Sequence, residues 1–156
     1  MAVLVRSAVR FILPAACVWA EEQERAILQN GVALTPAFLG DATRLGVQCP
    51  ERVRLLAVKN VPPHPWDPWL RIIGEGLGLI SRYTAGMTFR YGIYIRSDWC
   101  WRRELVVHEL AHTAQYERFG GFRPFLEEYL SECVSPGYPF GFLEQEAERL
   151  AEEICR

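Results

Sequence analysis

The segment from Leu105 to His112 constrains the fold of this chain more than any other. It places His108 and His112 four residues apart, directly after a short apolar run. Residues four apart on an α-helix lie one turn above each other on the same face, so both imidazoles can reach one ion. Glu109 is rotated by about 100° from His108 and can approach a water on that ion without ligating it. The pattern therefore predicts a helix with a metal site near its middle.

The composition makes a chance match to this pattern improbable. The chain has three histidines, and two of them stand in the motif. The alternative is a helix whose histidines are satisfied by backbone or solvent, but two imidazoles and a carboxylate on a partly buried helix need partners. A catalytic zinc ion usually has three protein ligands and keeps a water whose pKa falls to about 7. We therefore expect zinc as the cofactor, with a third protein ligand.

The third ligand is expected on a later helix, because no further histidine closely follows His112. Apolar residues at helical spacing predict a helix over residues 142–154. On its helical wheel, Glu144 borders the apolar stripe beside two alanines, which would let another helix come close. Glu146 borders the opposite side and is expected to be solvated. The wheel favours Glu144 as the ligand, and Glu148, one turn later, can orient a motif histidine through its other ring nitrogen.

The remaining pattern indicates a single domain over residues 1–156. Half of the residues are hydrophobic, which is enough to bury a core without disulfides. The proline-rich segment 61–68 is expected to be a loop, and His64 within it is expected to be solvated. The order of elements ends in three consecutive helices and indicates an α+β fold, with helices packed on a small sheet. Helices are predicted over 14–29, 35–45, 68–80, 97–118, 124–133 and 142–154, and strands over 52–58, 88–91 and 93–96.

Charge and hydropathy exclude several classes of partner. The formal net charge is −2 and the arginines are scattered, so nucleic-acid binding is not expected. No apolar run approaches the ~20 residues that span a bilayer. The five cysteines lie far apart, which favours free thiols in a reducing, cytoplasmic compartment. Secretion is the alternative, because residues 1–20 have the outline of a secretory signal, but Pro14 interrupts the apolar stretch and a folded helix is favoured.

The motif residues also carry a family resemblance. The segment His108-Glu109-Leu110-Ala111-His112, followed downstream by Glu144 and Glu148, resembles the gluzincin branch of the zincin metallopeptidases. From about residue 88 to the C-terminus, the chain is similar to the minimal members called minigluzincins. It is also similar to related bacterial proteins of unassigned function that have Gln and an aromatic residue after the second histidine, as in Gln115-Tyr116. Glu148 stands where many relatives have an aspartate.

The resemblance implies a zincin-like fold and a role for each motif residue. His108, His112 and Glu144 would hold the metal, and Glu109 would act as general base. Residues 93–96 would form the edge strand above the cleft, where an extended peptide or protein substrate adds by backbone pairing.

Gluzincins commonly place a tyrosine or histidine to stabilise the oxyanion of the reaction. Tyr138, in the loop before the last predicted helix, is the candidate for this role. Tyr116 and Tyr129 are instead expected to pack in the core.

Two functions remain open on these residues. The favoured one is a zinc-dependent hydrolase of peptide bonds, in which Glu109 takes a proton from the metal-bound water and returns it to the leaving amine. The alternative is a non-catalytic metal-binding or protein-interaction module that keeps the site for stability. Such a closed site would have a fourth protein ligand, with Glu146, Cys133 and His64 as the candidates.

Overall fold

A small mixed sheet forms the centre of the molecule. The computed structural model describes residues 2–63 and 68–156 and contains, within them, one four-stranded sheet in the order β1-β2-β4-β3. β2 and β4 run parallel, and the other two neighbouring pairs run antiparallel. The strands are β1 (Val32–Ala33), β2 (Arg54–Val58), β3 (Gly86–Phe89) and β4 (Gly92–Arg96).

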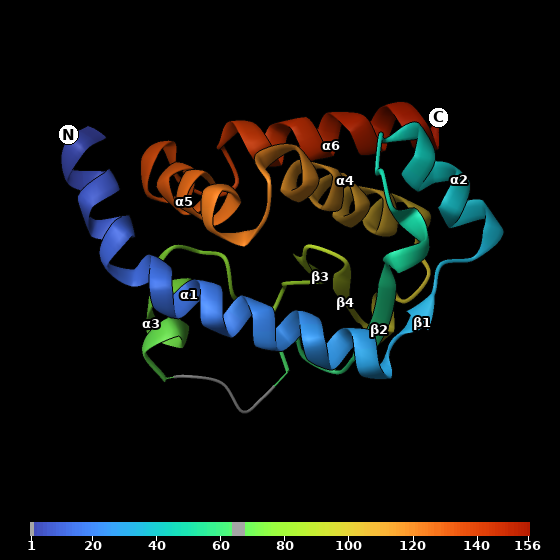
Figure 1. The fold of residues 1–156 in the computed structure, drawn as a ribbon, viewed down its shortest axis with the longest axis horizontal. Coiled ribbons are helices and arrows are strands. Elements are labelled where there is room, and N and C mark those ends of the chain that lie inside the picture. Colours follow the sequence, from blue (N-terminus) through green and yellow to red (C-terminus); the bar gives the residue numbers. More distant parts are fainter. Residues whose placement is uncertain (1, 64–67) are drawn as a thin grey trace.

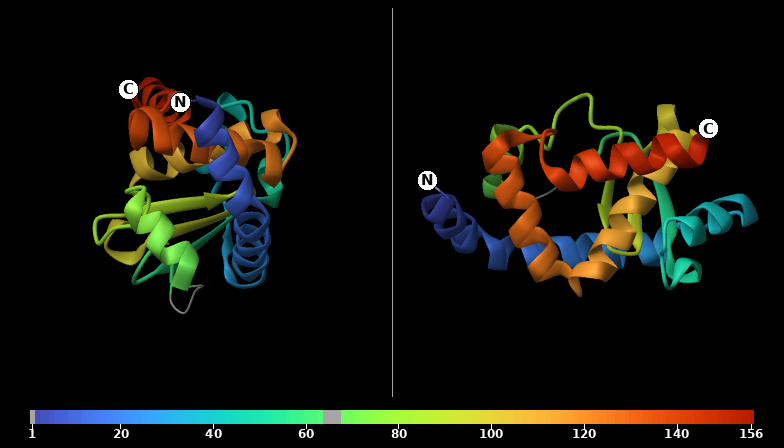
Figure 2. Two further views of the ribbon diagram at one scale, coloured as in Figure 1. Left: turned by 90° about the vertical axis from the view of Figure 1, so that its left-hand side faces the viewer. Right: turned by 90° about the horizontal axis from the view of Figure 1, so that it is seen from above.

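Helices cover both faces of this sheet. α1 crosses one face, α4 packs on the other, and α6 lies along α4 on the side away from the sheet (Figures 1 and 2). α5 lies along α1, so it closes one end of the helical layers. The expected α+β class is confirmed. The helices are α1 (Ala2–Asn30), α2 (Pro36–Arg44), α3 (Pro68–Gly76), α4 (Arg103–Phe119), α5 (Phe122–Glu132) and α6 (Phe142–Cys155).

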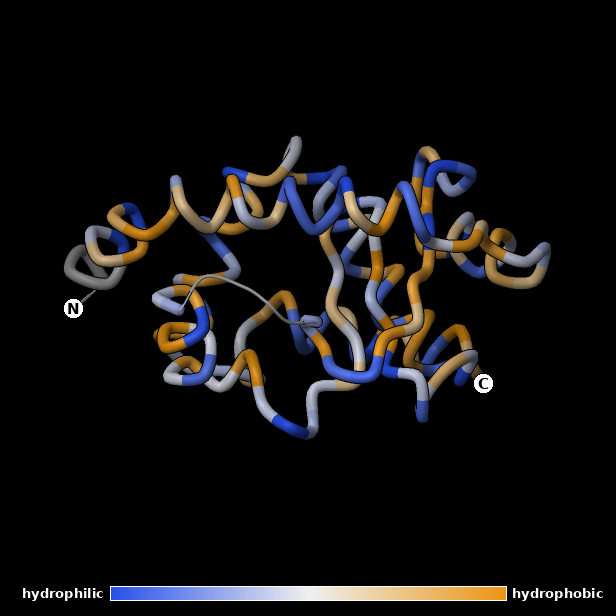
Figure 3. Tube along the Cα trace, turned by 90° about the horizontal axis from the view of Figure 1, so that it is seen from below, coloured by the Kyte–Doolittle hydropathy of each residue, from blue (hydrophilic) through white to orange (hydrophobic). Residues whose placement is uncertain are grey.

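The central strand β4 separates two apolar clusters. Ile93 and Ile95 belong to the cluster that contains Leu110 of α4, whereas Tyr94 belongs to the cluster that contains Ile27 of α1. This alternation is the period of two that a strand covered on both faces requires. Apolar residues accordingly predominate on the central strands (Figure 3). The sheet thus holds α1 and α4 at fixed positions on opposite sides.

α1 and α3 differ in length from the predicted helices. The predicted first helix begins at Pro14, but α1 begins at Ala2 and contains Pro14. An interior proline costs a helix about 3 kcal/mol, and packing along α5, with Val9 and Leu13 buried, offsets this cost. α3 ends at Gly76 rather than residue 80, within a run of alternating glycines, each of which weakens a helix by up to about 1 kcal/mol.

The helix that carries the motif begins later than predicted. Ser97 and Asp98 are the predicted cap, but residues 97–99 form a 3₁₀ turn and α4 begins at Arg103. The Asp98 carboxylate binds Arg96 instead, with Oδ1 2.6 Å from Nε. Because Asp98 is engaged in this exposed ion pair, its side chain does not cap the helix.

Glu24 of α1 fastens the turn between β3 and β4. Its carboxylate accepts hydrogen bonds from Nε and Nη2 of Arg90, at 2.9 and 2.7 Å, and from the backbone N of Tyr91 at 3.1 Å. Gly92 follows this turn, and a Cβ there would lie 3.2 Å from the Cα of Glu24. Glycine therefore allows α1 to approach the sheet closely, and the hairpin is held against α1.

Across the described ranges 2–63 and 68–156, none of the helices combines the length and the apolar character that crossing a lipid bilayer requires.

Candidate metal centre

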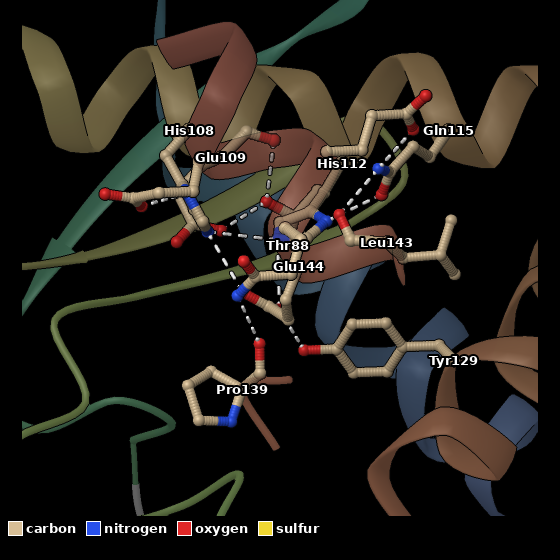
Figure 4. A network of polar contacts seen from close by, with 12 residues as sticks. Thr88, His108, Glu109, His112, Gln115, Tyr129, Pro139, Leu143 and Glu144 are labelled. Atoms are coloured by element: carbon tan, nitrogen blue, oxygen red, sulfur yellow. Dashed lines mark hydrogen bonds and ion pairs between the residues drawn. The ribbon is translucent and has the colours of Figure 1, made fainter. Parts of the chain in front are cut away.

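Two packed helices bring the predicted ligands together. α4 carries His108 and His112 one turn apart, and α6 carries Glu144. The helices pack along their lengths, with Ala151 of α6 buried against Val107 of α4. The small side chain at 151 lets the helices approach closely, as the helical wheel predicts. The structure therefore brings all three predicted ligands to one place (Figure 4).

The donor atoms have the spacing of ligands around one ion. Nε2 of His108 and Nε2 of His112 lie 3.2 Å apart. Oε2 of Glu144 lies 3.4 Å from Nε2 of His108, and Oε1 of Glu144 lies 3.3 Å from Nε2 of His112. A tetrahedral zinc ion with bonds of about 2.0–2.1 Å separates its ligand atoms by about 3.3 Å. The two histidine nitrogens have about this spacing, and Glu144 faces each of them with a different oxygen, so the group could hold a metal ion.

Gln115 fixes the ring of His112 with its lone pair toward this centre. The amide nitrogen of Gln115 donates to the backbone oxygen of Leu143 at 2.9 Å and to Glu146 at 2.8 Å. Its amide oxygen then faces Nδ1 of His112 at 2.8 Å, so Nδ1 is the donor. In the neutral ring, Nε2 carries the lone pair and points to Glu144. This is the tautomer that metal ligation needs.

The contacts of two further glutamates of α6 support one prediction and contradict another. Nδ1 of His108 lies 3.4 Å from Glu148, which supports the predicted orienting role of that carboxylate. The prediction that Glu146 is solvated is wrong. Its side chain is only 14% exposed and binds Gln115 and Arg118, at 2.8 and 2.6 Å. Glu146 thus supports His112 through Gln115.

Glu144 and His112 shift the pKa values of each other in opposite directions. Burial lowers the pKa of His112, but its hydrogen bond to Glu144 and the charge of that carboxylate outweigh burial and raise the pKa to about 9. Burial raises the pKa of Glu144, but its bonds to His108 and His112 outweigh this and hold the pKa well below its ordinary value. Glu144 therefore favours the protonated form of His112, and an ion bound at this group would replace that proton.

Glu109 lies beside the ligand group and is held by the sheet edge. Its Oε2 accepts a 2.6 Å hydrogen bond from Oγ1 of Thr88, and the residue is 5% exposed. A Cβ at Gly86 would lie 2.5 Å from Oε1 of Glu109, so β3 needs glycine there. Two residues of β3 thus aim this carboxylate.

The edge strand beside the site is β3 and not the predicted 93–96 segment. That prediction is wrong, because β4 is paired on both sides, with β2 and with β3. The hairpin turns at Arg90-Tyr91, which leaves the earlier strand on the outside. Gly86, Thr88 and Glu109 line the same cavity as the metal group. β1 is the other edge strand of the described sheet, but β3 is the edge strand that borders this cavity, so an extended chain at the site could pair along β3.

The tyrosines are distributed differently from the prediction. Tyr116 is buried and packs against Phe125, as predicted. Tyr129 also stacks on Phe125, but its hydroxyl donates to Oε1 of Glu144, so the prediction that it only packs is wrong. Tyr138 borders His108 and Glu109 in the cleft. The part of its side chain that is buried, together with the charge of Glu144, raises the pKa of Tyr138, although the residue as a whole is 40% exposed.

Two openings reach the ligand group. A partly open cavity of about 150 Å³ extends from the histidines toward α1 and α3. A more open cleft lies on the other side, bordered by His108, Glu109, Tyr138 and Glu148. The position opposite the three ligands is thus accessible to a small molecule or a peptide.

Among residues 2–63 and 68–156, the group of metal-ligating side chains comprises three members and no fourth. Glu146 is engaged by Gln115 and Arg118, and Cys133 is not part of the group. His64 lies within residues 64–67, outside the part of the chain that the structure describes.

Replacing Gln115 with Leu is expected to weaken metal binding by about 10- to 100-fold, the usual effect of losing a partner that orients a ligand. Glu148→Gln should cost less, because the side chain of Glu148 is 65% exposed and water can replace it. The measurement is a competition titration with a chromophoric chelator. Glu153→Gln, on the exposed side of α6, serves as control. Equal affinities for Gln115→Leu and the control would contradict the role assigned to Gln115.

Comparison of the chain with protein-family models, with curated protein sequences and with solved structures gave no match.

Proposed function

We propose that this chain is a zinc-dependent hydrolase of peptide bonds with a zincin-like fold. The observation that carries the proposal is the convergence of His108, His112 and Glu144, whose ligand atoms lie within 4.8 Å of one another, with the carboxylate of Glu109 beside them. Two imidazoles and one carboxylate are a ligand set that catalytic zinc sites use. The order of edge strand, motif helix and glutamate helix supports the zincin-like fold.

Zinc, when bound, would polarise the carbonyl of the substrate and lower the pKa of a water to about 7. Glu109 is placed to move the proton. Thr88 occupies Oε2 of Glu109, so Oε1 is the atom that accepts a proton and returns it to the leaving amine. Tyr138, at the border of the cleft, is the residue we assign to the oxyanion.

A peptide or protein substrate would lie along β3. The outer side of this strand has no strand partner within the described sheet. The backbone oxygen of Thr88 already accepts a hydrogen bond from the hydroxyl of Tyr116 at 3.4 Å, so pairing with an extended chain would use the backbone of Gly86. Gly86 stands on this strand next to Glu109. Pairing there would bring a peptide bond to the carboxylate and the metal group.

Removal of metal tests the function directly. The purified protein is expected to bind one zinc per chain, measured by elemental analysis, and to cleave members of a mixed peptide library, measured by mass spectrometry. A strong chelator should abolish cleavage, and stoichiometric zinc should restore it.

The outcome also separates the proposed enzyme from the module. One tightly bound zinc per chain, with no cleavage of a broad library, would favour a non-catalytic metal-binding module. Absence of zinc binding would contradict both functions.

A further inference from the structure

The partly open cavity next to the metal group is built mainly from apolar side chains of the first half of the chain and of α5. α1 contributes one wall and α3 another, and α5 closes the side opposite β3. At its inner end, the cavity reaches both histidines, Glu109 and Glu144. The apolar walls include Ile12, Ala16, Trp19, Ile73, Phe125 and Leu130.

The position of the cavity argues that it holds part of a substrate. A packing defect has no reason to open onto three metal-ligating side chains and the general base. The cavity also borders Gly86 and Met87 of β3, the strand along which a substrate would pair. Successive side chains of an extended chain point to opposite faces, so a residue paired on β3 can direct its side chain inward.

The size and chemistry of the cavity identify the occupant. Its volume is about 150 Å³. An apolar cavity of about this volume in another protein stays dry and binds benzene. Burial of a large apolar side chain contributes roughly 1.5–3 kcal/mol, whereas a charged or amide side chain would lose its hydration without gaining partners on these walls.

We propose that this cavity is a specificity pocket that takes a large apolar side chain, of the size of Phe, Leu or Met, from a residue flanking the cleaved bond. The inference rests on the proposed peptidase function. It assigns a role to α1 and α3, which carry none of the motif residues. Substrate selection would then depend on α1 and α3 together with α5, whereas the chemistry depends on α4 and α6.

Two pairs of variants test the pocket. Ala16→Phe fills it from α1, whereas Ala15→Phe places the same ring on the exposed side of that helix. Ile73→Trp fills it from α3, whereas Ile72→Trp changes a neighbour that faces solvent. In a peptide library with the zinc-loaded protein, the wild type should prefer Phe, Leu and Met over Ala at one position. Filling should lower that preference by about 10- to 100-fold, and the exposed variants should keep it.

A binding measurement separates failure of the pocket from failure of the proposed function. Toluene is the probe, and saturation-transfer NMR on the folded protein is the readout, with circular dichroism to verify that each variant folds. Wild type, Ala15→Phe and Ile72→Trp should bind toluene, and both filled variants should bind it at least about 10-fold more weakly.

The outcomes are distinct. Cleavage without apolar preference, or a preference unchanged by both filling variants, overturns the pocket and leaves the peptidase intact. Toluene binding that filling abolishes, in a protein that cleaves nothing, supports an apolar pocket and contradicts the peptidase. Absence of toluene binding to the wild type overturns the pocket whatever the library shows.

Discussion

Glu109→Gln is expected to bind zinc as the wild type does and to lose peptide cleavage by about 10²–10⁴-fold in kcat, the usual contribution of a general base. Gln has the shape of Glu and can still accept the hydrogen bond that Thr88 donates. The amide of Gln cannot accept the proton that Oε1 of Glu109 would take from the water. Because Glu109 does not belong to the group of ligand atoms, its amide should leave metal affinity unchanged.

The measurement combines zinc stoichiometry with kcat on the best library peptide. Glu153→Gln is the matched control, since it makes the same chemical change on the exposed side of α6. Unaltered stability of Glu109→Gln in urea would verify that the sheet edge is intact. Cleavage within about 10-fold of the wild type would contradict the role of Glu109 as the base.

His108→Ala is expected to lose zinc. Structural zinc sites bind with roughly 10–16 kcal/mol over four ligands, so one ligand corresponds to about 3–4 kcal/mol, or about 10²–10³-fold in affinity. His108 suits this test because its side chain is 19% exposed, compared with 8% for His112. Its removal should therefore disturb the core less.

Thermal unfolding gives an independent readout of the same change. A ligand that binds only the folded state raises stability in proportion to its affinity. Zinc should raise the melting temperature of the wild type and leave that of His108→Ala unchanged, while the two metal-free proteins melt at similar temperatures. An equal zinc-dependent rise in both would show that the ion binds elsewhere.

The ligands could be predicted because each depends on local periodicity. The four-residue spacing of His108 and His112 places them on one face wherever the helix packs. Glu144 lies on the flank of α6 that Ala151 keeps close to α4, and α6 begins at the predicted residue. A helical wheel contains this information, so the pattern identified the group that the structure brings together.

Apart from Glu148, the residues around the ligands could not be predicted, because they depend on tertiary placement. Tyr129 reaches Glu144 only because α5 turns back toward the site. Glu146 is buried by Arg118 and Gln115, which come from another helix. One signal was present in the sequence. Gln115 follows His112 by three residues, the spacing at which side chains on a helix meet.

The order of the strands in the sheet also could not be predicted from the local sequence pattern. Both segments of the β3–β4 hairpin have strand character, and nothing in either indicates which is central. The parallel pairing of β2 with β4, across the connection that contains α3, decides it. A connection of that kind cannot be recognised from the strands alone.

The dependence of the site on α6 has a consequence during synthesis. Glu144, the carbonyl of Leu143 that fixes Gln115, and Glu148 all belong to this helix, whereas the histidines are made more than thirty residues earlier. A nascent chain that has completed α4 has two imidazoles and a base but lacks the third anchor for the ion. The growing polypeptide should therefore stay inert toward its neighbours until α6 has emerged and docked, so that maturation of the centre is coupled to completion of the fold.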